Sequence, residues 1–475
     1  MHQALLVSEV LLDIFAQVNQ IPSTGKKPLS WTSLASLAVT CKAFYEPAMD
    51  LLWAKVDRLQ PLLGCVSRLH PLIYHRSRPP WDDTWAEGIE PLTADETHQF
   101  LHHSARIRSL CLPSTDRLFP LLSVIPIEPC VFPRLQSLAL FSNTRMGLFL
   151  PHTLLPGAAL KHLSIKAFDK NTADQLSMLS DRVCLCKQLV TLSCPSLDWA
   201  AWKHLSNLPT LVEVGIREVC GYDAPPVPLD RHIVDFSPFL NLTALSFTVE
   251  SPAYVITILQ HSQFPSVKTF WIMIEMIFST EAEELFCALS CCKKTLEQLT
   301  VVLNEYHDPQ HSYLKALTHL LCFTQLRFLQ LDCLDSCIYL DNNLLLEATA
   351  AWPYIHTLKI EDCGIRPCVT FRGLFTAIHQ CPQLESLRVL INTVNIDIDP
   401  DVQPTQHTSL RTLDLETPES PIGNAEVLAR IILKWLPCVD QVNKVADDWE
   451  PWDEVNAYIT SLRDVRRVMG DVSNT

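Results

Sequence analysis

The sequence repeats one short pattern along most of its length, and this repeat constrains the fold more than any other feature. In the pattern, apolar residues stand at the first, fourth and sixth positions, as in LQSLAL at 135–140 and LRTLDL at 410–415. The last two apolar positions are two residues apart, so in a β-strand both side chains lie on one face. A single short strand cannot bury that face, whereas stacked copies can. Twelve copies begin at Ile107, Leu135, Leu160, Leu189, Leu211, Leu242, Val267, Leu296, Leu326, Ile355, Leu384 and Leu410.

The spacing of these copies predicts what connects the strands. Successive copies begin about 27–28 residues apart on average, within the range of leucine-rich repeats. A proline just before several strands, as in FP at 132–133 and WP at 352–353, ends the preceding helix and favours extended chain. Residues 107–436 therefore resemble leucine-rich-repeat proteins; an accidental periodicity in a leucine-rich α/β domain is the alternative. Apolar residues recur with helical spacing between strands at 172–186, 280–289, 344–351, 371–379 and 425–435.

The segment before the repeats has helical rather than strand periodicity, and three short helices are expected there. Pro47 suits the first turn of the third helix. So small a helical unit cannot bury all its apolar surface, so an apolar face for a partner helix is expected. An amphipathic cap that only shields the first repeat is the alternative. The first stripe is Leu11, Ile14, Phe15 and Val18, and the second is Trp31, Leu34, Leu37, Ala38, Cys41 and Phe44.

Residues of both stripes, together with Leu6, Glu9, Leu52 and Trp53, match one known motif, so residues 4–55 resemble an F-box. Two features depart from the family pattern: Val7 replaces a proline, and the loop at 19–30 is long. A Thr93-x-x-Glu96 capping box opens a helix before the first repeat, and the whole layout resembles the expanded F-box families of mushroom-forming (basidiomycete) fungi. The residues that match the family are Leu6, Glu9, Val10, Leu11, Ile14 and Phe15 in its opening, then Leu34, Leu37, Cys41, Lys42 and Phe44, and finally Leu52 and Trp53.

The resemblance implies a function. F-box proteins with such repeats are substrate-recognition adaptors of SCF-type (Skp–cullin–F-box) ubiquitin ligases: the F-box docks the Skp adaptor, and through it a cullin, while the repeats bind a protein substrate. Such a subunit is not an enzyme. A stand-alone leucine-rich-repeat scaffold with a degenerate F-box is the alternative, motivated by Val7 and the long loop. The residues expected to bind the Skp adaptor are Leu6, Glu9, Leu11, Ile14, Phe15, Leu34, Leu37, Cys41, Phe44, Leu52 and Trp53.

The expected fold class is therefore α/β, with an N-terminal three-helix F-box-like module followed by a leucine-rich-repeat solenoid, or horseshoe, of about twelve repeats. Four regions are expected: the module at 1–64, a linker and N-terminal capping helix at 65–106, the solenoid at 107–436 and an acidic C-terminal cap at 437–475. Strand residues that alternate with core positions should line the concave face. Those chosen there as candidate substrate contacts are Phe141, Arg217, Trp271, Phe328, Lys359 and Arg388.

Charge and composition exclude several other functions. A net charge of −15 without a basic patch argues against nucleic-acid binding. Only 11 glycines leave little material for phosphate-binding loops, and no cofactor is expected. No signal peptide or membrane span is expected either, so the 18 cysteines, Cys291–Cys292 included, are interpreted as helix or core thiols in the cytoplasm or nucleus. Cys287, Cys291, His307 and His311 approach zinc-finger spacing, but a repeat strand lies between them, so no metal is expected.

Overall fold

The computed structural model describes the chain in seventeen stretches that include most of the repeats. They are residues 7–19, 29–74, 89–113, 118, 121, 125, 131–142, 159–167, 172–218, 236–307, 316–333, 338–362, 368–394, 396–399, 405–416, 422–442 and 450–472. The chain divides into two compact units, Met1–Leu211 with Arg217–Val219, and Val212–Ile216 with Cys220–Thr475.

The first unit combines a helical start with the first strands of the sheet. Strands β1 to β5 pair in parallel in that order. In chain order its elements are α1 (Ser8–Asn19), α2 (Leu29–Thr40), α3 (Lys42–Leu52), β1 (Lys55–Val56), α4 (Gln60–Leu63), α5 (His70–Tyr74), α6 (Ala94–Ser104), β2 (Ser109–Leu112), β3 (Ser137–Ser142), β4 (His162–Ala167), α7 (Ala173–Leu185), β5 (Thr191–Cys194) and α8 (Trp199–Ser206).

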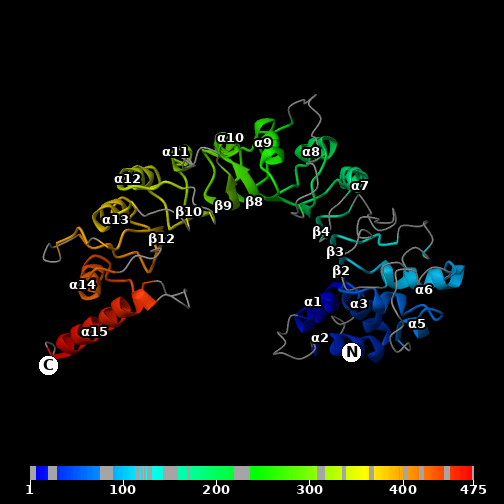
Figure 1. Cartoon of the computed structure of the whole chain (residues 1–475). Coiled ribbons are helices and arrows are strands. Elements are labelled where there is room, and N and C mark those ends of the chain that lie inside the picture. The colour runs from blue at the N-terminus through cyan, green and yellow to red at the C-terminus, as the bar shows by residue number, and fades with distance from the viewer. Residues whose placement is uncertain are drawn as a thin grey trace. The chain divides into compact units, whose positions relative to one another are not determined.

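The second unit alternates strands and helices, and Figure 1 shows its helices together on one side of the strands. Strand β6 (Glu213–Arg217) lies at the division in the sequence, and β7 to β13 pair in parallel in order. The elements that follow are β7 (Ala244–Val249), α9 (Ala253–Gln260), β8 (Thr269–Phe278), α10 (Ser279–Leu289), the 3-10 helix η4 (Ser290–Cys292), β9 (Gln298–His307), α11 (Ala316–Leu320), β10 (Phe328–Cys333), α12 (Asn342–Ala351), β11 (Thr357–Asp362), α13 (Phe371–Ile378), β12 (Ser386–Leu390), β13 (Thr412–Glu416), α14 (Ala425–Trp435) and α15 (Glu450–Val472).

The repeated pattern sets the register of the sheet. Each of the twelve hexapeptides contains a strand that begins two residues after its first residue. The fourth position of one copy pairs with the fourth position of the next, as Leu329 does with Leu299 and Leu358. These side chains are buried between the strands and the helices. The apolar residue before the proline also enters this core, where the Trp352 indole N–H donates to the Leu320 carbonyl at 3.2 Å.

The return helices begin where the sequence offers a capping side chain. Thr172, Asp198, Asp341 and Asn424 each accept a backbone N–H from the first turn of α7, α8, α12 and α14, respectively. The five helical segments predicted between strands correspond to α7, α10, α12, α13 and α14. The predicted Thr93–Glu96 capping box is also confirmed, because each side chain bonds the backbone N–H of the other residue.

The structure differs from the sequence interpretation in the helical start. Cys41 is extended and separates α2 from α3, so Phe44 belongs to α3 rather than to the second helix. The placement of Pro47 in a first helical turn is wrong, because Pro47 lies buried in the middle of α3. The two-residue strand β1 falls inside the range assigned to the helical module and pairs with β2. The sheet therefore begins before the first hexapeptide.

Candidate partner-binding surfaces

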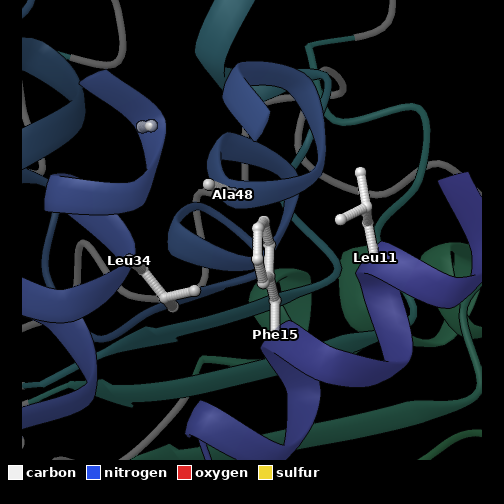
Figure 2. Packing of buried hydrophobic residues seen from close by; sticks show 5 residues of the cluster. Leu11, Phe15, Leu34 and Ala48 are labelled. Carbon is white, nitrogen blue, oxygen red and sulfur yellow. The ribbon is translucent and has the colours of Figure 1, made fainter. Parts of the chain in front are cut away.

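Three of the residues that the sequence pattern assigned to a partner lie in the core of the three-helix module. Leu11 and Phe15 of α1, Leu34 of α2 and Ala48 of α3 are buried together, and Figure 2 shows the Phe15 ring with Leu34 and Ala48 on one side and Leu11 on the other. Phe44 meets the Phe15 ring edge-on, with centroids 5.5 Å apart. Leu11, Phe15 and Leu34 are only 1–3% exposed, so in this structure they form the core of the module, and their predicted contact with the Skp adaptor stays a prediction.

The other predicted Skp-adaptor contacts are distributed between core edge and surface. Ile14 is 42% exposed. Leu6 lies outside the described residues, and so does the side chain of Glu9. The remaining residues are partly buried around the module core or beside it: Leu37, Cys41, Phe44, Leu52 and Trp53.

An apolar stripe nevertheless remains on the surface of the module. Val7, just before α1, and Val10 and Ile14 within it are exposed and spaced by three and four residues, so helical geometry places them on one side. Trp31 of α2 is exposed as well. We call Val7, Val10, Ile14 and Trp31 the apolar stripe. The sequence signal for the stripe is that Val10 and Ile14 each precede a core position, 11 and 15, but of the four stripe residues only Ile14 was predicted as a contact.

The module is joined to the repeats by polar and aromatic contacts within the first unit. The nearly buried Arg106 side chain, which follows α6, bonds Asp50 at 2.5 Å and Glu46 at 2.6 Å, both on α3. Trp53 stacks on His103 of α6, with ring centroids 4.5 Å apart. Burial lowers the pKa of His103, and the neighbouring His102 and Arg106 lower it further.

The second candidate surface is the side of the sheet opposite the helices in the second unit. Burial alternates along β7, β8, β10 and β12, with half-buried side chains between buried ones. We call these alternate side chains of β7–β13 the open face. One row of the open face, formed by paired residues on successive strands, is Ser246, Trp271, Thr300, Gln330, Lys359, Arg388 and Asp414.

Four of the six predicted substrate contacts lie on this open face. Trp271, Lys359 and Arg388 belong to the row just described, and Phe328 lies on the same face at the start of β10. Phe141 is on β3 in the first unit, where it pairs with Lys166. Arg217 is exposed at the end of β6. The structure therefore brings together the aromatic and charged residues of the later repeats and not the whole predicted set.

The open face has an apolar part and a charged part. Half-buried Trp271 and Met273 of β8 represent the apolar part, and Val302 of β9 pairs with Met273. In the charged part, Arg388 forms an ion pair with Glu361 at 2.8 Å.

Two aspartates complete the charged part. Gln330 donates to one carboxylate oxygen of Asp332 at 2.7 Å. Burial raises the pKa of Asp414, while the positive charges of Arg388 and Lys359 act in the opposite direction. The open face thus offers aromatic contact area beside fixed charges, which is the composition of protein-binding hot spots.

Across the described residues there is no cluster of three His, Cys, Asp or Glu side chains arranged to hold a metal ion. Within those ranges, no helix has both the length and the apolar character needed to span a membrane.

The parallel sheet with one strand per repeat and helices in the connections is an architecture of the leucine-rich-repeat type, so the chain is an α/β repeat protein. No protein-family model matches the chain, and neither does any curated protein. Among solved structures it is similar to the one described as the crystal structure of a TLR13–ssRNA13 complex, with 12% sequence identity and a TM-score of 0.33. The similarity covers 75% of this chain and 49% of that one, so the chain spans about half the length of that protein.

Proposed function

We propose that this chain is the substrate-recognition adaptor of an SCF-type ubiquitin ligase, in which the helical module docks the Skp adaptor and the open face binds a protein substrate. The observation that carries the proposal is the exposed apolar stripe on α1 and α2. Leu11 and Phe15 already stabilise the module, so exposed Val10 and Ile14 are not needed for its core. Exposed apolar side chains grouped on one helix favour a partner helix. The F-box resemblance identifies that partner as the Skp adaptor.

The open face supports the second half of the proposal. Trp271 and Phe328 provide rigid aromatic area, and Lys359 and Arg388 provide charges within the same set of paired strands. In this proposal the chain performs no chemistry. It raises the effective concentration of the substrate beside a ubiquitin-loaded enzyme that the cullin recruits.

The test is a pull-down of purified Skp adaptor by the full chain carrying single substitutions in the apolar stripe. We expect Ile14→Asp and Val10→Asp to reduce recovery of the adaptor strongly, because each places a carboxylate in the proposed apolar interface. Val394→Asp is the matched control, since Val394 is an exposed valine of the later repeats. Leu11 and Phe15 are unsuitable positions, because a charge there would unfold the module itself.

Each outcome of this pull-down has a defined meaning. Recovery by wild type and Val394→Asp, with loss in both stripe variants, supports the proposal. Equal recovery by all four proteins would show that the stripe is not the docking surface. Failure of the wild type to recover the adaptor would exclude the ligase role.

A stand-alone repeat scaffold is the second candidate function, and one observation favours it. Three residues that match the F-box pattern, Leu11, Phe15 and Leu34, are used by the module for its own core. A scaffold would retain partners through the open face and lose them on Trp271→Ala and Arg388→Ala. It would never co-purify with a cullin, with or without the substitutions in the stripe.

A further inference from the structure

Two adjacent thiols lie in contact at the end of α10. Cys291 and Cys292 are the last two residues of the 3-10 helix η4, and their Sγ atoms are 3.5 Å apart. Cys291 is exposed, whereas Cys292 is buried. The pair therefore combines a sulfur of an exposed residue, itself partly shielded, with a buried second sulfur held directly beside it.

The two thiols differ in their acidity for a structural reason. The hydrogen bond with Cys292 lowers the pKa of Cys291, against the effect of burial. The same hydrogen bond, together with burial, raises the pKa of Cys292. Since the thiolate is the nucleophilic form of cysteine, Cys291 is the sulfur that reacts first and Cys292 is the sulfur placed to resolve the product.

We propose that Cys291 and Cys292 form a redox modification site that hydrogen peroxide converts into a vicinal disulfide. The Cys291 thiolate attacks a peroxide oxygen, so that an S–O bond forms, the O–O bond breaks and the leaving oxygen departs as water after taking a proton. Cys292 then attacks the Cys291 sulfur; the S–S bond forms, the S–O bond breaks, and the Cys292 proton leaves with the hydroxyl group as a second water. Two thiols and one hydrogen peroxide thus give one disulfide and two waters.

The bond would be readily reversible. The Cα atoms of adjacent residues are about 3.8 Å apart across a trans peptide, which is shorter than the separation of about 4.4–6.8 Å in ordinary disulfides. A ring closed over so short a distance is strained, and strained disulfides are the easily reduced ones. This chemistry suits a switch rather than a permanent crosslink.

The position of the pair connects it to the open face. The Cys292 carbonyl accepts the backbone N–H groups of Thr295 and Leu296, both at 3.1 Å, in the turn that leads to β9. Strand β9 lies between β8, which carries Trp271, and β10, which carries Phe328. Closing the ring moves the Cys291–Cys292 peptide, so we expect it to loosen this turn beneath the apolar part of the open face.

The experiment uses the reduced full chain, treated with hydrogen peroxide and then with N-ethylmaleimide before tryptic digestion. The peptide 269–293 contains Cys287, Cys291 and Cys292. We expect it to lose two hydrogens and to carry a single maleimide, on Cys287, and reduction with dithiothreitol to restore two further labelling sites. Cys287→Ser should form the same bond, whereas Cys292→Ala should accumulate sulfinic acid on Cys291 because no resolving thiol remains.

Several results would overturn the proposal. A bond between Cys287 and Cys291, or equal sulfinic acid formation in wild type and Cys292→Ala, would exclude the vicinal pair. A second measurement uses the wild type alone, so it does not depend on how Cys292→Ala folds. Hydrogen exchange at the Thr295 and Leu296 amides should rise on oxidation and recover on reduction. If the Cys291–Cys292 disulfide forms but hydrogen exchange at these two amides does not change, the proposed link to the open face is wrong.

Discussion

Neighbouring residues of α1 have opposite roles, and one helical step separates them. Phe15 is enclosed by α2 and α3, while Ile14 beside it is exposed. Each residue advances a helix by about 100°, so adjacent apolar side chains can face a core and a partner. An apolar side chain therefore stabilises the module at position 15, whereas the apolar side chain at position 14 is available for binding.

We expect Phe15→Ala to destabilise the module by about 3–5 kcal/mol, the usual cost of removing a buried aromatic side chain. Ile14→Ala should change the free energy of unfolding by no more than about 0.5 kcal/mol, because its side chain is largely exposed. Hydrogen exchange of the amides in α1 and α2 measures both effects. Similar protection in the two variants would contradict the core that Phe15 forms with Leu34 and Ala48.

A second residue-scale prediction concerns acid sensitivity at His103. The folded-state pKa of His103 is lowered, so between that pKa and the ordinary value of about 6.5 the unfolded chain binds more protons than the folded one. The contribution of His103 to stability is then present above about pH 6.5 and is lost as the pH falls through the lower pKa. We expect α6 and α3 to exchange hydrogen faster as the pH is lowered through this window, after correction for intrinsic exchange rates.

His103→Phe keeps a ring against Trp53 without a titrating group, so it should remove most of this pH dependence. His98→Gln, at an exposed position on the same helix, is the control and should retain it. The ion pair of Glu96 with Arg68 does not contribute in this window, because it holds the pKa of Glu96 at about 2. A His103→Phe variant as acid-sensitive as the wild type would contradict the prediction.

At the scale of elements, a side chain takes the place of a further strand beyond β13. Val442 forms a parallel bridge with Leu413 of β13. The Asn456 side chain of α15 accepts the Val442 N–H and donates to the Val442 carbonyl, both at 2.9 Å. Its amide thus occupies the backbone groups that a further strand would use, which protects the sheet edge from pairing with another chain.

We expect Asn456→Ala to expose these groups and to promote self-association through the sheet edge. Loss of the two hydrogen bonds should also lower stability by about 1–3 kcal/mol. Light scattering across a concentration series measures the association. Thr460→Ala, one turn further along the exposed side of α15, is the control and should remain at the wild-type mass.

Period-two alternation explains why the strands could be predicted from the sequence and much of the helical start could not. The hexapeptides specify both a strand and its buried face, so the starts of β2 to β13 and the outward positions Trp271, Lys359 and Arg388 follow directly. Strand β1 has only Lys55 and Val56, and its pairing with β2 arises from the tertiary structure.

In the module, core and surface residues lie on overlapping helical stripes. The pattern therefore could not separate Phe15 from Ile14. Nor could it show that Phe141 and Trp271 belong to different compact units, because the repeat continues unchanged across the division.

At the scale of the whole chain, the helical module and the first repeats form a single compact unit. Arg106 is central to this joint, because its guanidinium binds two acids of α3 while its side chain is only 10% exposed. Arg134 approaches the other oxygen of Asp50 at 3.6 Å from a more exposed position. Helix α3 therefore contributes one face to the module core and a second to the repeats.

We expect Arg106→Ala to lower the stability of this joint by about 1–3 kcal/mol, because it leaves Glu46 and Asp50 without their main partner. The loss stays in this range because Glu46 is well solvated and water replaces part of the interaction. Hydrogen exchange should increase in α3 and β1 and stay unchanged in α10 to α14. Arg134→Ala should have an effect within about 0.5 kcal/mol. Equal losses of stability in Arg106→Ala and Arg134→Ala would contradict the central role of Arg106.

Strand β1 has a consequence for how such a chain can be recombined, in the laboratory or in evolution. The backbone of Ala54 accepts the N–H groups of Arg108 and Ser109 where β1 joins β2, so the last residues of the module are also the first residues of the sheet. A cassette cut between helices and repeats would leave β2 as an open edge, ready to pair with foreign strands. A module grafted from another chain would have to bring its own edge strand and acids that match Arg106. The junction is therefore one structural piece, and point substitutions on its surface dissect it more cleanly than deletions.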